Sequence, residues 1–306
     1  MRDIDETKRA LISAGYVASE AIATAAFLSN GLGKALLVEG PAGVGKTELG
    51  RALATATGRM LIRLQCYEGL DESRALYEWD YTKQLIYTQL LKEKVGALIE
   101  GADTLEAAAR RIGESGAAFF NERFLLPRPV LQALLSDTPT LLLVDEIDKA
   151  DPEFEAFLLE VFEGWSVTLP ELGTIAARHP PRAVLTSNNA RELSDALRRR
   201  CLHLWLDFPD EAREVEIVRS RLPGISERLA RRVVAAVHKL RDFELKKPPS
   251  LSETLDWARA LSLLGVEELG LDVLSQTLGV TLKHASDERI TRERLFEVAE
   301  AAGRIG

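Results

Sequence analysis

Hydrophobic positions in the first two thirds of the chain fall into short runs that are bounded by turn-forming residues and separated by helical patterns. Five runs are too short for helices and are expected to be strands, at residues 34–39, 60–66, 140–145, 182–187 and 202–206. Runs that are apolar throughout are typical of parallel strands covered on both faces. Strands that alternate with helices therefore predict an α/β fold with a parallel sheet.

The segments between these strands show helical periodicity. Helices are expected at 4–29 as a lead-in to the first strand, at 46–57, along a long stretch at 71–99, and at 101–116 with a turn. Apolar segments at 165–169 and 174–177 flank a Pro-Glu-Leu-Gly turn, which predicts a β-hairpin that stands off the main sheet.

The strand-like runs stop at Pro209. Amphipathic helices are expected beyond it, at about 210–221, 226–242, 250–263, 267–284 and 291–302. The sequence therefore predicts two domains, an α/β domain at 1–208 and a smaller all-α domain at 209–306.

Composition excludes several classes of protein. Hydrophobic residues at 46% and charged residues at 28% match an ordinary globular chain rather than a disordered, collagen-like or disulfide-scaffold one. A net charge of −8 is poorly suited to gripping a nucleic-acid backbone, so no nucleic-acid partner is expected.

Cysteine usage and the N-terminal region indicate the compartment. Cys66 and Cys201 are far apart and lack CxxC spacing, so they are expected to be buried thiols rather than zinc ligands or a disulfide. The apolar stretch at 10–28 contains Glu20, unlike a secretory signal or a membrane span. A cytoplasmic protein is expected.

A phosphate-binding motif follows the first predicted strand and opens a helix. It fits GxxxxGK[ST] and consists of Gly40, Pro41, Ala42, Gly43, Val44, Gly45, Lys46 and Thr47. Glycines let backbone N–H groups turn toward phosphate oxygens at the positive end of a helix, Lys46 reaches the terminal phosphates, and Thr47 supplies a hydroxyl ligand to Mg²⁺. The motif predicts a nucleoside triphosphate site.

A second motif ends the predicted strand at 140–145 with two carboxylates, Asp145 and Glu146. Doubly wound sheets bind their ligands at the carboxyl ends of the strands. Asp145 is expected in the Mg²⁺ shell, partly through water, and Glu146 is expected to polarise the attacking water.

Together these motifs resemble the AAA+ ATPases, and more narrowly the MoxR branch with its CoxD-like members, which mature a molybdenum-containing carbon monoxide dehydrogenase. The resemblance covers nearly the whole chain. Its supports are residues 40–47, LLLVDEIDK at 141–149, the hairpin that begins Glu-Gly-Trp at 163–165, VLTSNN at 184–189 and ALRRRC at 196–201. The pattern implies a P-loop NTPase core with an insertion at 71–124 and a hairpin, followed by a helical lid.

The resemblance also implies further site residues. Asn188 falls at the sensor 1 position, with Asn189 as the adjacent alternative; capping of a helix near Arg191 is the competing interpretation for one of the two. Arg200 is selected as the arginine finger that reaches a neighbour's ATP.

Two features of that pattern remain open. Arg198 and Arg199 are alternatives for the finger, and all three arginines are also ordinary partners of a helix C-terminus. Ser252 stands where the family usually has a sensor 2 arginine. Arg259, on the same helical face, is a possible replacement or a solvated surface side chain.

By resemblance, the expected function is that of an ATP-hydrolysing motor-type chaperone that forms a ring, expected to be a hexamer. It would act with a von Willebrand factor A domain protein on a metalloenzyme client that awaits its molybdenum cofactor. The alternatives are a DNA-directed AAA+ ATPase of the helicase or clamp-loader type, which the acidic balance disfavours, and a small-molecule kinase, which the carboxylate pair and arginine cluster fit less well.

Overall fold

A computed structural model describes residues 1–90, 104, 124–170 and 172–303. The chain divides into two compact units. The first comprises Met1–Thr57, Thr186–Ala190 and the chain from Leu202 onward, and the second comprises Gly58–Leu185 and Arg191–Cys201. The prediction for 101–116 lies outside the described residues, apart from Thr104.

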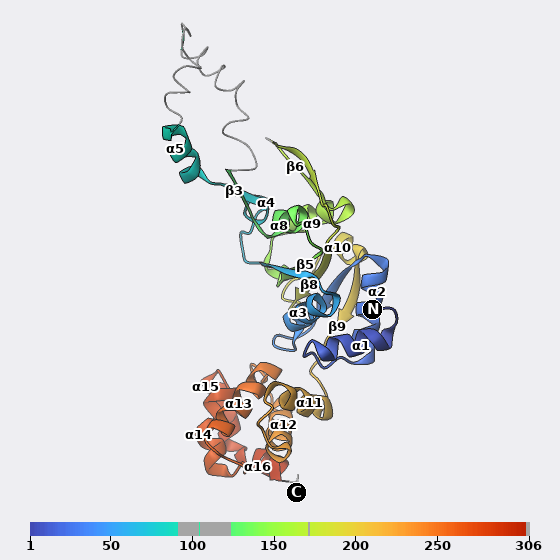
Figure 1. The fold of residues 1–306 in the computed structure, drawn as a ribbon. Helices are drawn as coiled ribbons and strands as arrows, with labels where there is room; N and C mark the ends of the chain where they lie inside the picture. The colour runs from blue at the N-terminus through green and yellow to red at the C-terminus, as the bar shows by residue number, and fades with distance from the viewer. Residues whose placement is uncertain (91–103, 105–123, 171, 304–306) are drawn as a thin grey trace. The chain divides into compact units, whose positions relative to one another are not determined.

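A five-stranded sheet of order β2-β5-β8-β1-β9 forms the α/β part of the fold (Figure 1). Its strands are β1 (Ala35–Glu39), β2 (Met60–Gln65), β5 (Thr140–Asp145), β8 (Arg182–Ser187) and β9 (Cys201–Trp205). The β2–β5 and β5–β8 pairs are parallel. Every residue of β1 and β5 is buried, as expected for strands covered on both faces. The predicted parallel-sheet α/β fold is confirmed.

The lead-in region holds two helices rather than the single one expected at 4–29. They are α1 (Ile4–Ser13) and α2 (Glu20–Leu32), and the helix after the first strand is α3 (Lys46–Thr57). Gly15 adopts φ 80°, which ends the first helix, and the Ser19 hydroxyl caps the second by accepting from the Ile22 N–H at 3.3 Å. The break was not predicted because the apolar residues keep helical spacing on both sides of it.

Six helices lie in the described part of the C-terminal region, which Figure 1 colours from gold through orange to red. They are α11 (Glu211–Arg221), α12 (Glu227–Arg241), α13 (Leu251–Leu263), α14 (Leu271–Thr281), α15 (Ala285–Glu293) and α16 (Leu295–Gly303). The helix expected at 291–302 is instead the end of α15 followed by α16, because the chain leaves helical geometry at Arg294. The helix expected at 267–284 is shorter, since it begins only after Gly270.

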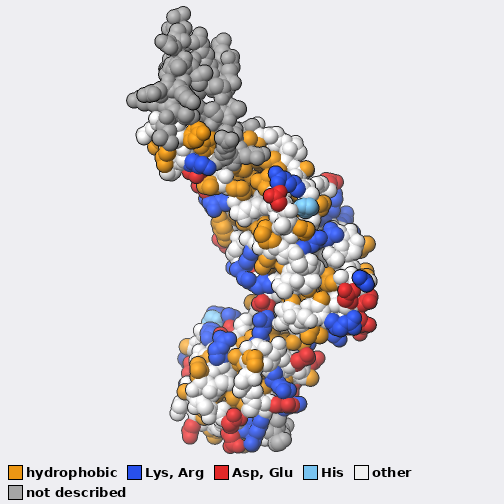
Figure 2. Space-filling view, viewed as in Figure 1, with side chains coloured by type: hydrophobic (Ala, Val, Ile, Leu, Met, Phe, Trp, Pro, Cys, Tyr) orange, Lys and Arg blue, Asp and Glu red, His pale blue; other side chains and the backbone are white. Residues whose placement is uncertain are grey.

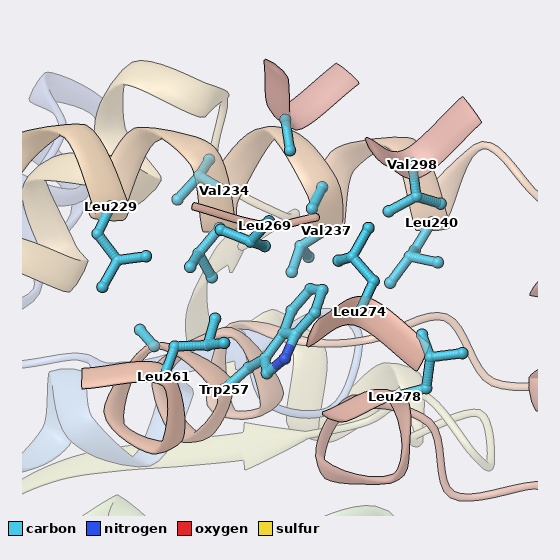
Figure 3. Close-up of a cluster of buried hydrophobic side chains, with 14 of the residues drawn as sticks. Leu229, Val234, Val237, Leu240, Trp257, Leu261, Leu269, Leu274, Leu278 and Val298 are labelled. Carbon is cyan, nitrogen blue, oxygen red and sulfur yellow. The ribbon is translucent and has the colours of Figure 1, made fainter. Parts of the chain in front are cut away.

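One apolar cluster holds these helices together (Figure 3). Leu229, Val237 and Leu240 lie on the side of α12 that faces Trp257 and Leu274. The Trp257 side chain is fully buried, and its Nε1–H donates to Thr277 Oγ1 at 2.9 Å, so the one polar atom of the indole is satisfied. The region therefore has a core of its own.

The stretch expected as one long helix at 71–99 is broken. It holds α4 (Glu72–Leu76), β3 (Tyr77–Trp79) and α5 (Tyr81–Leu90), while residues 91–99 lie outside the described part. β3 pairs antiparallel with β4 (Leu125–Pro127), with Glu78 opposite Leu126. Aromatic residues at Tyr77 and Trp79 favour a strand once a partner strand is available.

The predicted hairpin is present. β6 (Ser166–Leu169) pairs antiparallel with β7 (Gly173–Ala176). It follows α9 (Pro152–Gly164), which ends where Trp165 adopts left-handed backbone geometry with φ 47°. Among the described residues of the second unit, the other helices are α8 (Pro129–Leu135), a 3₁₀ turn (Ile147–Lys149) and α10 (Asp195–Arg200).

Candidate nucleotide site

The glycine-rich loop at 40–47 joins β1 to α3. Gly40, Gly43 and Gly45 adopt φ values of 151°, 75° and 94°, a region that other residues rarely enter. A Cβ on Gly40 would lie 1.9 Å from the carbonyl oxygen of Leu206. Close backbone approach and positive φ therefore both require glycine here.

The amino group of Lys46 turns back onto this loop. Its Nζ donates to the carbonyl oxygens of Gly40 at 2.7 Å and Pro41 at 2.6 Å, and the side chain is buried. A buried ammonium held over a loop of glycines at a helix N-terminus is a site of the kind that phosphate groups occupy. The residues present fit a triphosphate.

A cavity of about 590 Å³ adjoins this loop within the first compact unit. That volume lies within the range of ordinary ligand pockets. Four segments line the cavity. The loop contributes Gly43, Val44 and Gly45, and the connection from α1 to α2 contributes Tyr16 and Val17. The segment after β9, together with α11, contributes Leu206, Phe208, Arg213, Ile217 and Arg221, and helix α13 contributes Ser252, Leu255 and Arg259.

Tyr16 forms the part of the wall beside the phosphate loop. Two atoms of its side chain, including the hydroxyl oxygen, lie 3.8 Å from the position that a Cβ would take on Gly45. Burial raises the pKa of Tyr16 to about 12, even though the charge of Arg213 acts in the opposite direction. The phenol is therefore neutral at physiological pH and keeps its proton for a hydrogen bond.

Three arginines line the same cavity. Arg213 donates to the carbonyl oxygen of Val17 at 2.9 Å, and Arg221 Nη2 lies 3.6 Å from Glu48 Oε1. Arg259 is largely exposed and lies 3.8 Å from Asp256 Oδ1. Guanidinium groups are well suited to anionic ligands such as phosphate. Sequence reasoning had selected only Arg259.

At the start of α13 two serines lie beside the glycine-rich loop. Ser250 caps this helix, with Glu253 completing a capping box. A Cβ on Gly43 would lie 2.1 Å from the Ser250 hydroxyl oxygen and 3.5 Å from that of Ser252. Ser252, which stands where the resemblance leads one to expect a sensor 2 arginine, thus lies beside the loop and carries no charge.

The second motif lies at the end of β5. Asp145 is almost fully buried, at 2% exposed, and Arg63 of β2 donates to its Oδ2 from Nε at 3.0 Å and from Nη2 at 2.5 Å. Glu146 adopts left-handed geometry, with φ 58°. Its Oε2 accepts from Gln65 Nε2 at 2.9 Å and pairs with Lys149 Nζ at 2.7 Å.

Charge and burial around this pair affect two neighbours. The hydrogen bond and charge of Glu146 raise the pKa of Lys149. Burial raises the pKa of the Cys66 thiol to about 12, and the charges of Asp145 and two other nearby carboxylates act in the same direction. Cys66 and Cys201 are both buried and are not joined by a disulfide, which confirms the expectation of buried thiols.

Arg63 and Gln65 were missed by sequence reasoning. A signal for them exists in β2, where Ile62, Leu64 and Cys66 are buried while Arg63 and Gln65 alternate with them on the exposed face. Two polar side chains on one face of a strand next to β5 are candidates for contacts with its carboxylates.

The asparagine pair follows β8. Asn188 is half-buried, while Asn189 is exposed, adopts φ 58° and donates its backbone N–H to Ser187 Oγ at 3.0 Å. The helix-capping interpretation is wrong, because α10 begins at Asp195 and its cap is Ser194, whose hydroxyl accepts from the Leu197 N–H. The sensor role of Asn188 stays a prediction.

The arginine cluster ends α10. Arg199 and Arg200 are exposed and Arg198 is half-buried. Arg200 Nη2 donates to Glu163 Oε1 at 3.1 Å, and both side chains are more than half exposed. A pair this exposed is weak, so Arg200 can leave it for another anion.

Within the described residues, no cluster of three or more His, Cys, Asp or Glu side chains is arranged to hold a metal ion. No helix among them has the length and apolar character that crossing a membrane requires.

The part of the chain that holds these strands and loops matches the model of a known protein family. The AAA domain of the dynein-related subfamily matches residues 35–201, which is more than half of the 306 residues. The chain belongs to this AAA family. The family's P-loop fold implies nucleotide binding, and the matched range includes both carboxylates and the arginine cluster of this AAA protein.

The AAA protein is also similar to a gas vesicle ATPase and to two solved structures. Gas vesicle ATPase GvpN from Haloferax mediterranei is 34% identical over 110 residues, a match that covers 33% of the AAA protein and 32% of GvpN. The AAA protein thus aligns with about a third of that relative's length. Two mutant forms of RuvB from Thermotoga maritima are 16% identical, with TM-scores of 0.47 and 0.46; they cover 94% and 85% of this chain, and 73% and 67% of theirs.

Proposed function

We propose that this AAA protein binds ATP with magnesium and hydrolyses it. The observation that carries the proposal is the phosphate loop at 40–47, whose glycines adopt positive φ and whose Lys46 amino group is buried over the loop, beside a cavity of ligand size. The cavity wall combines apolar side chains with three arginines, as a nucleoside triphosphate requires.

The residues of the two motifs divide the chemistry. Backbone N–H groups of residues 40–47 and the Lys46 ammonium bind the phosphates. Thr47 and Asp145 are the oxygen ligands that would hold Mg²⁺, partly through water, and the bound ion supplies neutralisation of phosphate charge. Asp145 suits this role because it is a buried carboxylate whose ordinary compensation is a cation.

Glu146 orients and polarises the attacking water. It now shares Oε2 between Gln65 and Lys149, so it must exchange at least one of these partners for the water. Asn188 helps to place that water, and Arg200 of a neighbouring subunit neutralises charge that develops as the terminal phosphoryl group leaves. The exposure of Arg200 supports an action outside its own subunit.

Hydrolysis between subunits requires a ring, which we propose to be a hexamer of the MoxR type that remodels a protein client. We further propose that residues 1–208 form the nucleotide-binding core and residues 209–306 the lid. The shared cluster around Trp257 supports the helical part of this division. A partner with a von Willebrand factor A domain and a client enzyme awaiting its molybdenum cofactor follow from family resemblance alone.

The distribution of charged side chains disfavours a nucleic-acid client. On the face shown in Figure 2, Lys and Arg side chains are interspersed with Asp and Glu over the described residues. A backbone of phosphates is gripped by clustered cations. The net charge of −8 agrees with this argument.

Comparing Glu146→Gln with the parent chain tests the proposal. We expect the variant to retain binding of a fluorescent ATP analogue and to lose turnover by at least about 10²-fold, because it can no longer accept the proton of the attacking water. Release of inorganic phosphate measures turnover. If the variant turns over at the parental rate, the role of Glu146 is wrong, and if the parent binds no adenine nucleotide, the proposed function is wrong.

A further inference from the structure

Arg63 occupies the carboxylate that the proposed function assigns to magnesium. Its Nε and Nη2 both donate to Asp145 Oδ2, at 3.0 and 2.5 Å. The Asp145 side chain is 2% exposed, whereas that of Arg63 is 41% exposed. The cation that balances this buried acid therefore reaches it from the solvent side of the sheet.

Strand register explains how Arg63 reaches it. In the parallel β2–β5 pair, Arg63 stands opposite Leu143 and Gln65 stands opposite Asp145. The long arginine side chain thus extends along the strands toward their carboxyl ends, over a distance of two residues. A shorter side chain at this position would not cover the same span.

Gln65 links this pair to the second carboxylate. Arg63 Nη2 also donates to Gln65 Oε1 at 2.5 Å, and Gln65 Nε2 donates to Glu146 Oε2 at 2.9 Å. Lys149 pairs with the same Glu146 oxygen. A row of hydrogen bonds along β2 therefore ties both acids of the second motif to side chains of their own unit.

We propose that Arg63 is a built-in competitor of magnesium at Asp145, which holds the second motif in a resting arrangement until a metal–nucleotide complex displaces it. This inference rests on the proposed function. Arginine is always charged, so its pairing with Asp145 opposes a divalent cation both by covering the oxygen and by charge repulsion. Displacing Arg63 also removes the hydrogen bond that it donates to Gln65 Oε1. The Gln65 side chain can then turn away and release Glu146.

The competing explanation is that Arg63 only positions Asp145 for the metal. The two explanations predict opposite changes in the affinity for magnesium when the charge of Arg63 is removed. A competitor that is lost lets magnesium bind at lower concentration, whereas a lost positioning contact makes magnesium bind less well. Under both explanations Arg63 acts through its contact with Asp145.

The experiment measures the affinity of the full chain for a fluorescent, non-hydrolysable ATP analogue over a range of Mg²⁺ concentrations. In Arg63→Gln, we expect the half-saturating Mg²⁺ concentration to fall about fivefold, as suits the loss of a partly exposed ion pair. Arg63→Lys keeps the charge but not the forked donors, so it should lower the Mg²⁺ midpoint less than Arg63→Gln does. Arg178→Gln, which removes an exposed arginine paired with Asp137, should match the parent.

The outcomes separate the two proposals. A parent that binds no analogue at any Mg²⁺ concentration contradicts the proposed function. A parent that binds it, with an unchanged or raised Mg²⁺ midpoint in Arg63→Gln, leaves that function standing and overturns the competitor role. If Arg63→Gln does not fold, Arg63→Met, which keeps the aliphatic stem, carries the same test with the same opposing outcomes.

Discussion

Arg241 binds both carboxylate oxygens of the buried Glu214, with Nη1 at 2.7 Å from Oε2 and Nη2 at 2.9 Å from Oε1. His238 Nε2 and the Thr254 hydroxyl complete the shell of Glu214, at 2.8 and 2.6 Å. The four side chains come from α11, α12 and α13, so this network joins three helices of the C-terminal region. It complements the apolar cluster around Trp257.

Arg241→Met is expected to destabilise the chain by about 3 kcal/mol, because removing one partner leaves a buried charge poorly compensated. Urea unfolding followed by circular dichroism measures the change. Arg219→Met is the matched control, since Arg219 is in an exposed pair with Glu227 and its loss should cost about 0.5 kcal/mol. Equal effects of the two substitutions would contradict the importance of the Glu214 network.

Stability should fall in acid through Glu214. Burial by itself raises the pKa of this carboxyl, but hydrogen bonds from His238 and Arg241 lower it more, so the net pKa lies below its ordinary 4.5. A group with a lowered folded-state pKa contributes stability above its unfolded value and loses it as the pH falls through the folded value. This contribution is therefore complete above pH 4.5 and is lost below it.

A comparison of the parent with Glu214→Gln isolates that contribution. Urea midpoints measured from pH 6 downward should decline more steeply below pH 4.5 in the parent, because the amide does not titrate. Parallel declines in the two proteins would assign the acid sensitivity to other carboxylates.

Gly43→Ala is expected to weaken binding of an ATP analogue by about tenfold, because the added methyl group meets the Ser250 hydroxyl and forces the loop or α13 to shift. Gly173→Ala is a close control. Gly173 has φ 74°, against 75° for Gly43, but a Cβ there would have no neighbour within 4 Å. Both variants bear the backbone strain, so only Gly43→Ala should change nucleotide affinity.

Arg200→Ala should keep nucleotide binding and lose turnover by about 10³-fold or more, the effect typical of an arginine finger. Mixing it with Lys46→Ala subunits should restore part of the phosphate release, because those subunits retain Arg200. Arg199→Ala, at the neighbouring exposed position, serves as the control and should turn over like the parent. Mixed rings that show no recovery would contradict action across an interface.

Local pattern was enough to predict the five strands of the main sheet and the phosphate loop. All six residues of β5 are buried, so its apolar run reflects one environment, and the loop at 40–47 is contiguous in sequence. Neither prediction requires knowledge of distant partners. The hairpin of β6 and β7 is local in the same way.

Contacts between distant segments were not predictable. Arg63 and Asp145 are 82 residues apart, and the cavity draws its walls from four separate stretches of chain. β3 is a strand rather than part of a helix because it pairs with β4. In that pair Trp79 stands opposite Leu125. Hydrophobic periodicity reports which face a residue prefers, and it carries no information about which partner meets that face.

The state of the two native thiols bears on how this chain can be studied. Cys66 and Cys201 are 2% and 8% exposed, so both are shielded from reagents in solvent, and burial raises the pKa of the Cys66 thiol to about 12. A single cysteine introduced on the surface of α13 should therefore accept a maleimide dye selectively in the otherwise natural sequence. Movements of that helix on nucleotide addition could then be followed by fluorescence without first removing the native cysteines.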